Sequence, residues 1–140
     1  MILCDTGPMQ CLIDRTQQQH RAYTNAVVLL EKPLVTTWAC FAEAMHLAMK
    51  MGGRHLQRRL AGLIQIELLT IGDIHRSDYA RLFDLMEKYQ DQPMDLADAS
   101  LVVTAEKLKA TQILTLDSDF WVYRINDCEA FDVIQVERLG

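Results

Sequence analysis

Short apolar runs rich in β-branched residues alternate along this chain with longer segments in which apolar residues recur at helical spacing. The strand-like runs are residues 2–4, 34–37, 67–71, 112–115 and 131–136, and the helical segments are 19–31, 38–51, 54–65, 75–90 and 96–109. This alternation predicts the α/β class, with helices on both faces of a mostly parallel central sheet. Ligands of such sheets bind beyond the carboxyl ends of the strands, so we expect a site among the residues that follow them.

Local signals predict where several of these elements begin and end. Asp5-Thr6-Gly7-Pro8 predicts a turn after the first strand. Gly52-Gly53 predicts the end of the helix over 38–51. Asp73 and Asp95 stand where the N-caps of the helices over 75–90 and 96–109 are expected.

The 140 residues suit one domain, which we expect to span 1–140. No apolar run approaches the ~20 residues of a membrane span. The early charge at Asp5 argues against a secretory signal, so we expect a cytoplasmic protein. The cysteines show neither Cys-x-x-Cys nor a zinc-ligand spacing, and we expect free, buried thiols. They are Cys4, Cys11, Cys40 and Cys128.

The formal net charge of −5 argues against a nucleic-acid binder that works through a basic surface, because phosphate contacts require cations. The objection weakens if several carboxylates gather to hold a divalent metal ion, because the bound ion inverts the local charge. The positions of the acids therefore carry more information than their number.

Acids follow the first, second and fourth expected strands and occupy the start of one further helix. Carboxylates brought together there would repel one another, and a divalent cation removes that conflict. Carboxylate and water ligands are those that Mg²⁺ and Mn²⁺ prefer, and such a site suits phosphodiester hydrolysis. The six candidate metal ligands are Asp5, Glu43, Asp95, Asp98, Asp117 and Asp119.

Structural roles compete with metal binding at several of these positions. Asp95 could serve only as a helix cap. Asp117 and Asp119 could both form turns, and the pattern does not choose which of the two is the final ligand. Asp98 and Glu43 are embedded among apolar neighbours, which favours a functional role over a solvated helix face.

The densest cationic stretch runs from Lys50 to Arg59. Arg54 and Arg58 fall on one side of the expected helix, where they could contact substrate phosphates or form a solvated face. Trp121 and Tyr123 follow the last acids and could stack on a base, although packing is the more common role.

Two other classes of acid-bearing α/β domain fit the pattern poorly. A phosphorylated receiver domain needs a pair of acids after the first strand and a lysine after a late strand, and neither is present. A haloacid-dehalogenase-like phosphatase needs Asp-x-Asp after the first strand, where this chain has Asp5-Thr6-Gly7.

Four segments together resemble the PIN domain, and more narrowly the VapC-type toxins of bacterial toxin–antitoxin pairs. They are ILCDTGPM with Asp5, FAEAMHL with Glu43, PMDLADASLVVTAEKL with Asp95 and Asp98, and ILTLDSDF with Asp117 and Asp119. The match covers essentially the whole chain in the right order. It implies a three-layer α/β/α fold and a Mg²⁺- or Mn²⁺-dependent endoribonuclease.

The resemblance also implies roles for single residues and for partners. The catalytic quartet would be Asp5, Glu43, Asp98 and either Asp117 or Asp119, with Asp95 as an accessory acid and Thr6 placing water or metal. Where the family often has a basic residue between the last acids, this chain has Ser118. A homodimer and inhibition by a small antitoxin are implied, while the RNA that is cut stays undefined. The alternative is a PIN-like module that binds RNA or protein without catalysis.

Overall fold

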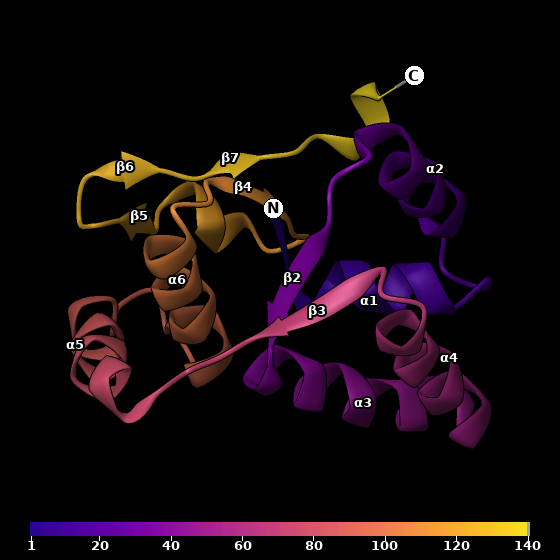
Figure 1. Cartoon of the computed structure of the whole chain (residues 1–140), viewed down its shortest axis with the longest axis horizontal. Coiled ribbons are helices and arrows are strands. Elements are labelled where there is room, and N and C mark those ends of the chain that lie inside the picture. The colour runs from indigo at the N-terminus through magenta and orange to yellow at the C-terminus, as the bar shows by residue number, and fades with distance from the viewer. Residues whose placement is uncertain (140) are drawn as a thin grey trace.

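Five parallel strands form the central sheet of this protein, whose computed structural model describes residues 1–139 (Figure 1). The strand order is β3-β2-β1-β4-β7, and every pairing in this sheet is parallel. The predicted α/β class and mostly parallel sheet are therefore confirmed. The strands are β1 (Ile2–Cys4), β2 (Leu34–Thr37), β3 (Leu69–Gly72), β4 (Gln112–Leu114) and β7 (Asp132–Val133).

Helices flank the sheet in two groups. The chain moves in one direction from β1 to β3 and then crosses back over β1 to reach β4. Because such crossovers are right-handed, this reversal places the first four helices on one face and the last two on the other. Figure 1 shows α1, α3 and α4 gathered on one side and α5 and α6 on the other. The helices are α1 (Thr6–Ile13), α2 (His20–Leu30), α3 (Trp38–Gly52), α4 (Arg54–Gln65), α5 (Tyr79–Lys88) and α6 (Leu96–Leu108).

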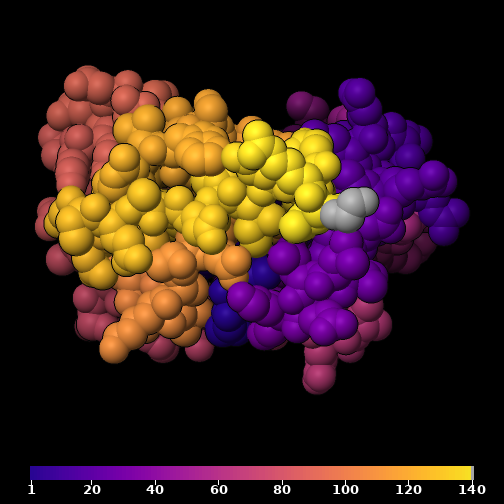
Figure 2. Space-filling view, turned by 90° about the horizontal axis from the view of Figure 1, so that it is seen from above, coloured from indigo at the N-terminus to yellow at the C-terminus, as the bar shows by residue number. Residues whose placement is uncertain are grey.

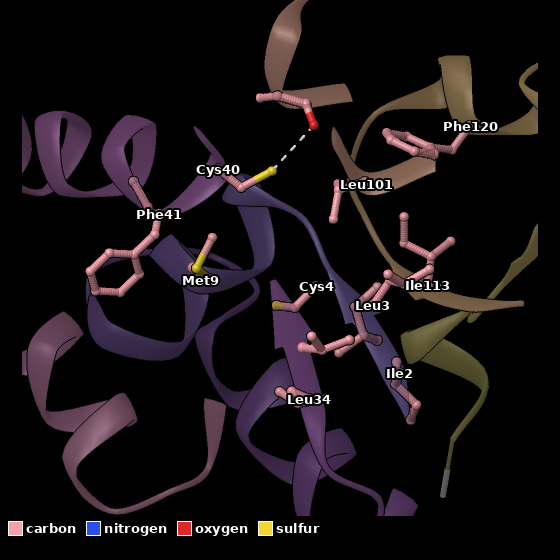
Figure 3. Close-up of a cluster of buried hydrophobic side chains, with 14 of the residues drawn as sticks. Ile2, Leu3, Cys4, Met9, Leu34, Cys40, Phe41, Leu101, Ile113 and Phe120 are labelled. Atoms are coloured by element: carbon pink, nitrogen blue, oxygen red, sulfur yellow. Dashed lines mark hydrogen bonds between the residues drawn. The ribbon is translucent and has the colours of Figure 1, made fainter. Parts of the chain in front are cut away.

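The core is built around β1 and the middle of α6, whose side chains are removed from solvent. All three residues of β1 are fully buried, and α6 is buried without interruption from Ala97 to Ala105. Figure 3 shows β1 at the centre of this cluster, with the Cys40 thiol donating to the Ala97 carbonyl oxygen at 3.6 Å. Any charged residue on this part of α6 must therefore face the interior or the sheet edge.

The segment expected to be a turn after the first strand is instead the start of α1. Asp5 is its N-cap and accepts a hydrogen bond from the Thr6 amide at 2.8 Å. Pro8 is tolerated because it lies in the first turn, where its missing N–H has no helical partner. A Cβ at Gly7 would lie 3.0 Å from the Leu116 side chain, so glycine permits α1 to approach the loop after β4.

Two boundaries between α4 and α5 differ from those expected. β3 begins at Leu69 rather than residue 67, because residues 66–68 extend the last turn of α4 and Glu67 adopts a φ of 62°. A 3-10 turn (Arg76–Asp78) precedes α5. Asp78, not Asp73, caps this end, and its carboxylate accepts a hydrogen bond from the His75 amide at 2.9 Å.

The C-terminal region also departs from expectation. The strand expected over 131–136 is reduced to β7 because Val136–Arg138 forms a 3-10 turn. A hairpin of β5 (Arg124–Ile125) and β6 (Glu129–Ala130), which the pattern did not predict, precedes it and turns through two residues with positive φ. Figure 2 shows the C-terminal segment crossing the molecule toward α2, where Gln19 donates to Glu137 at 3.2 Å.

The cysteines follow the expectation with one exception. All four are free thiols, and Cys4, Cys11 and Cys40 are buried as expected. Cys128 is exposed, because it lies in the turn of the unpredicted hairpin. Within residues 1–139, no helix has the length and apolar character needed to cross a membrane.

Replacing the buried Thr37 by valine tests how the end of β2 starts α3. The Thr37 hydroxyl accepts a hydrogen bond from the Cys40 amide at 3.2 Å and lies 2.6 Å from the Ser100 hydroxyl. Thr37→Val removes this cap, and we expect urea unfolding to show a loss of about 1–2 kcal/mol. Thr24→Val on α2 is the control and should change stability by less than about 0.5 kcal/mol. Equal stability of the two variants would contradict the capping role.

Candidate active site

Asp5 lies where β1 ends and α1 begins, and both of its carboxylate oxygens accept hydrogen bonds. One accepts from the Thr6 amide at 2.8 Å and the other from the Thr115 hydroxyl at 2.7 Å. The backbone amide of Asp5 donates to the Leu114 carbonyl at 3.0 Å, which continues the β1–β4 ladder. These bonds hold the carboxylate at the point where the strand order reverses, the usual ligand position of such sheets.

Asp117 is placed by the neighbouring strand β4 and by the same threonine. The Asp117 amide donates to the Thr115 hydroxyl oxygen at 2.9 Å, so Thr115 links the two aspartates. The Asp117 carboxylate accepts from the Asp119 amide at 2.9 Å and caps the short 3-10 helix Ser118–Trp121. This cap fixes the direction of the Asp117 side chain at the sheet edge.

Asp95 and Asp98 form a reciprocal capping box at the start of α6. The Asp98 amide donates to the Asp95 carboxylate at 2.8 Å, and the Asp95 amide donates to the Asp98 carboxylate at 3.3 Å. Asp98 is only 9% exposed and also lies 3.4 Å from the Tyr123 hydroxyl, which donates to it. Asp95 thus caps the helix as expected while standing next to the buried acid.

Three of these carboxylates converge. One oxygen each of Asp5, Asp98 and Asp117 lie within 4.8 Å of one another. They line a hollow of about 330 Å³. Glu43 and Asp95 also line this hollow and are exposed at its rim. The other residues around this hollow are Thr6, Gly7, Leu47 and Leu116.

Crowding and burial make the charged forms of these acids costly in the absence of a cation. Burial raises the pKa of Asp98 to about 7, and the charges of Asp95, Asp5 and Asp117 add to this. Burial also raises the pKa of Asp5, although the hydrogen bonds from Thr115 and Thr6 act in the opposite direction. The pKa of Glu43 is raised by burial and then by Asp95 and Asp5. A divalent ion between the carboxylates would remove the repulsion that raises these values.

The donor set fits a hard divalent cation. It consists of carboxylate oxygens without sulfur or imidazole, which is the preference of Mg²⁺ and Mn²⁺. Asp5, Asp98 and Asp117 could hold the ion directly, while Glu43 and Asp95 lie at the exposed rim of the same hollow. The arrangement could therefore bind an ion and a phosphate that approaches from solvent.

Comparison with known proteins agrees with this geometry. The PIN-domain family model matches residues 2–125. The chain belongs to the PIN-domain family. Ribonuclease VapC26 of Mycobacterium tuberculosis is 30% identical over 120 residues, covering 83% of this chain and 86% of that protein. The crystal structure of M. tuberculosis VapC20, a sarcin–ricin loop cleaving toxin, superposes with a TM-score of 0.77 at 12% identity, covering 85% of this chain and 92% of that one.

The PIN fold brings some of the predicted site residues together and leaves others apart. Asp5, Asp98 and Asp117 form the cluster, and Glu43, Asp95 and Thr6 line the same hollow. The Thr6 hydroxyl donates to the Cys40 carbonyl at 3.3 Å. Asp119 does not line the hollow and instead holds Asp117 through its amide. Arg54 and Arg58 are exposed on α4 and do not line it either.

Two residues of this PIN site were not among the predicted site residues. Thr115 joins Asp5 to Asp117, and the Thr-x-Asp spacing after β4 was the available signal. Tyr123, fully buried and stacked edge-on against Tyr89 and Phe120, donates to Asp98. Its packing role agrees with expectation, but no sequence signal joined it to an acid 25 residues away.

The raised pKa of Asp98 predicts a pH-dependent effect of Asp98→Asn on the metal-free protein. A folded-state pKa of about 7 exceeds the roughly 3.9 of an unfolded aspartate, so the folded state binds more protons between these values. The contribution of the Asp98 carboxyl to the free energy of unfolding therefore falls as pH rises from about 4 to about 7. We expect Asp98→Asn to raise the Tm in EDTA at pH 8, with the gain vanishing near pH 4.

Thermal melts of wild type and Asp98→Asn across this pH range measure the effect. Asp84→Asn, on the exposed side of α5, is the control for removing one charge from an acidic protein. A lower Tm for Asp98→Asn at pH 8 would show that the carboxylate stabilises the metal-free fold.

Proposed function

We propose that this protein is a Mg²⁺- or Mn²⁺-dependent endoribonuclease that acts as the toxin of a toxin–antitoxin pair. The observation that carries the proposal is the convergence of Asp5, Asp98 and Asp117 within 4.8 Å at the switch point of a PIN fold. The 30% identity to ribonuclease VapC26 supports RNA as the substrate class.

The residues of the cluster would divide the work of phosphodiester hydrolysis. A bound divalent ion supplies a nucleophile and positive charge that stabilises the phosphate undergoing attack. Asp5, Asp98 and Asp117 would hold that ion. Thr115 keeps Asp5 and Asp117 in register, and Tyr123 orients Asp98. Glu43 and Asp95 would position water at the exposed rim.

We propose that a small antitoxin protein binds and inhibits this toxin. We also propose that the protein acts in the cytoplasm and that residues 1–140 form one domain. The acids of the site would attract a cationic side chain of such a partner when no metal or RNA is present. The competing function is a PIN module that binds RNA or protein without cutting. Metal-dependent cleavage separates the two.

Cleavage of total RNA with Mg²⁺, Mn²⁺ or EDTA tests the proposed chemistry. Asp98→Asn and Asp5→Ala should each reduce cleavage by about 100-fold or more, because each would alter a proposed metal ligand and loss of even an outer-shell partner costs about 10–100-fold. Asp119→Asn is the matched control, since its amide and not its carboxylate supports the site, and it should stay within about threefold of wild type. RNA binding without cleavage by a folded wild-type protein would favour the binding module.

The homodimer is also proposed, and we assign it to an exposed apolar surface. Trp38, Tyr79, Phe83 and Leu96 are each at least 48% exposed and surround a hollow of about 340 Å³ between α3, α5 and α6. Exposed apolar groups that gather in this way mark interaction surfaces. This surface does not share residues with the acidic hollow.

Phe83→Asp should convert the dimer to a monomer, because it places a charge in the centre of the contact. Light scattering after gel filtration measures the mass directly. Val28→Asp, at an exposed apolar position on α2, is the control and should remain dimeric. A dimer that survives Phe83→Asp, or a monomeric wild type, would overturn this assignment.

A further inference from the structure

A second hollow, with basic residues in its lining, lies at the far end of the two helices that bound the acidic site. It has about 360 Å³ and is lined by Asp14, Arg15, Thr16, Met51, Gly52, His55, Leu56 and Arg59. Arg54 and Arg58, on the same helix as Arg59, extend the cationic surface. Arg54 and Arg58, the candidates that the sequence offered for phosphate contact, therefore line neither this hollow nor the acidic one.

Helices α1 and α3 connect the two hollows. Asp5, the N-cap of α1, lines the acidic hollow, and Asp14, its C-cap, lines the basic one. The eight residues of α1 span about 12 Å at about 1.5 Å per residue. α3 follows the same course, since Glu43 and Leu47 line the first hollow and Met51 lines the second. Figure 1 shows the two helices side by side.

The residues of α3 that pass from one hollow to the other form a single stripe. Glu43, Leu47 and Met51 are spaced four apart and so share one face of the helix. The stripe changes from a carboxylate to two flexible apolar side chains before it reaches the cations. Such a surface suits an extended polymer with anionic linkages and apolar faces.

Charge is segregated along this path. From Lys32 to Ile66 the only acid is Glu43, although the chain has 19 acids in total. Within the described residues, Arg15, Lys50, Arg54, Arg58 and Arg59 form no ion pair with an acid. Asp14 adds one negative charge, but it is buried and accepts four hydrogen bonds from Gln10, Thr16 and Gln17. The cations are therefore free to meet phosphates.

We propose that Arg15 and Arg59 bind backbone phosphates of a single-stranded RNA that runs from the acidic cluster along helices α1 and α3 to the second hollow. This rests on the proposed function for the position of the cut phosphate. Contacts of this kind are made to the backbone and carry no base preference. They would favour long single-stranded substrates over short ones and compensate for the net charge of −5.

Salt dependence of RNA binding tests the proposal. The probe is a fluorescein-labelled 12-nucleotide single-stranded RNA with Mg²⁺, bound to an Asp98→Asn background that cannot cut it. Each phosphate contact on a single strand contributes about 0.7 to the slope of log Kd against log salt concentration. We expect Arg15→Gln/Arg59→Gln to lower this slope by about 1.4 and to weaken binding at least tenfold at low salt.

Two control proteins separate charge from folding. Arg15→Lys/Arg59→Lys keeps both charges and should retain most of the slope. Arg21→Gln removes an exposed cation on α2, outside both hollows, and should leave the slope unchanged. Thermal melts check that each variant folds, and Arg15→Gln alone, with an expected loss of about 0.7, replaces the double variant if Arg59 proves structural.

The possible results distinguish this inference from the nuclease itself. If the double variant binds RNA with the same salt slope as the Asp98→Asn protein that keeps both arginines, the phosphate site is overturned. A protein partner would then be the ligand of these cations. Cleavage by wild type would still stand in that case. A reduced slope without any wild-type cleavage would support the RNA path while removing the proposed catalysis.

Discussion

The register between β1 and β4 is the constraint on which the site depends. Pairing of Leu3 with Ile113 and of Cys4 with Leu114 brings Asp5 next to Thr115, whose hydroxyl then joins Asp5 to the Asp117 backbone. A slip of one residue would turn these side chains to the opposite faces of the sheet. Because both strands are fully buried at these positions, the core itself prevents such a slip.

The fold holds several carboxylates close together and partly buried, although their mutual repulsion and their desolvation oppose this arrangement. Asp98 lies in the stretch of α6 that is buried without interruption, and burial raises its pKa to about 7. The capping box with Asp95 and the bond from Tyr123 offset part of that cost. A divalent ion between the carboxylates would relieve this repulsion, which supports the proposed metal site.

The acidic balance of the chain is compatible with an RNA substrate because the charges are unevenly distributed. The hollow at one end of α1 and α3 holds the carboxylates. The hollow at the other end is lined by Arg15 and Arg59, which form no ion pair with an acid among the described residues. A net charge counts all of these groups equally and says nothing about the surface that a substrate meets. If RNA follows the proposed path, this separation of charge answers the objection that the net charge raises.

The sequence by itself determined the α/β class, the long helices and the acids at strand ends, because these follow from local periodicity and from strand-to-helix alternation. It did not reveal α1, since a cap followed by glycine and proline is typical of both a turn and a helix start. Only the tertiary structure favoured Asp117 over Asp119 for the acidic hollow, joined Tyr123 to Asp98 and separated Arg54 and Arg58 from the acids. Those outcomes depend on which elements pack against one another. The spacing of residues along the chain does not reveal this long-range packing.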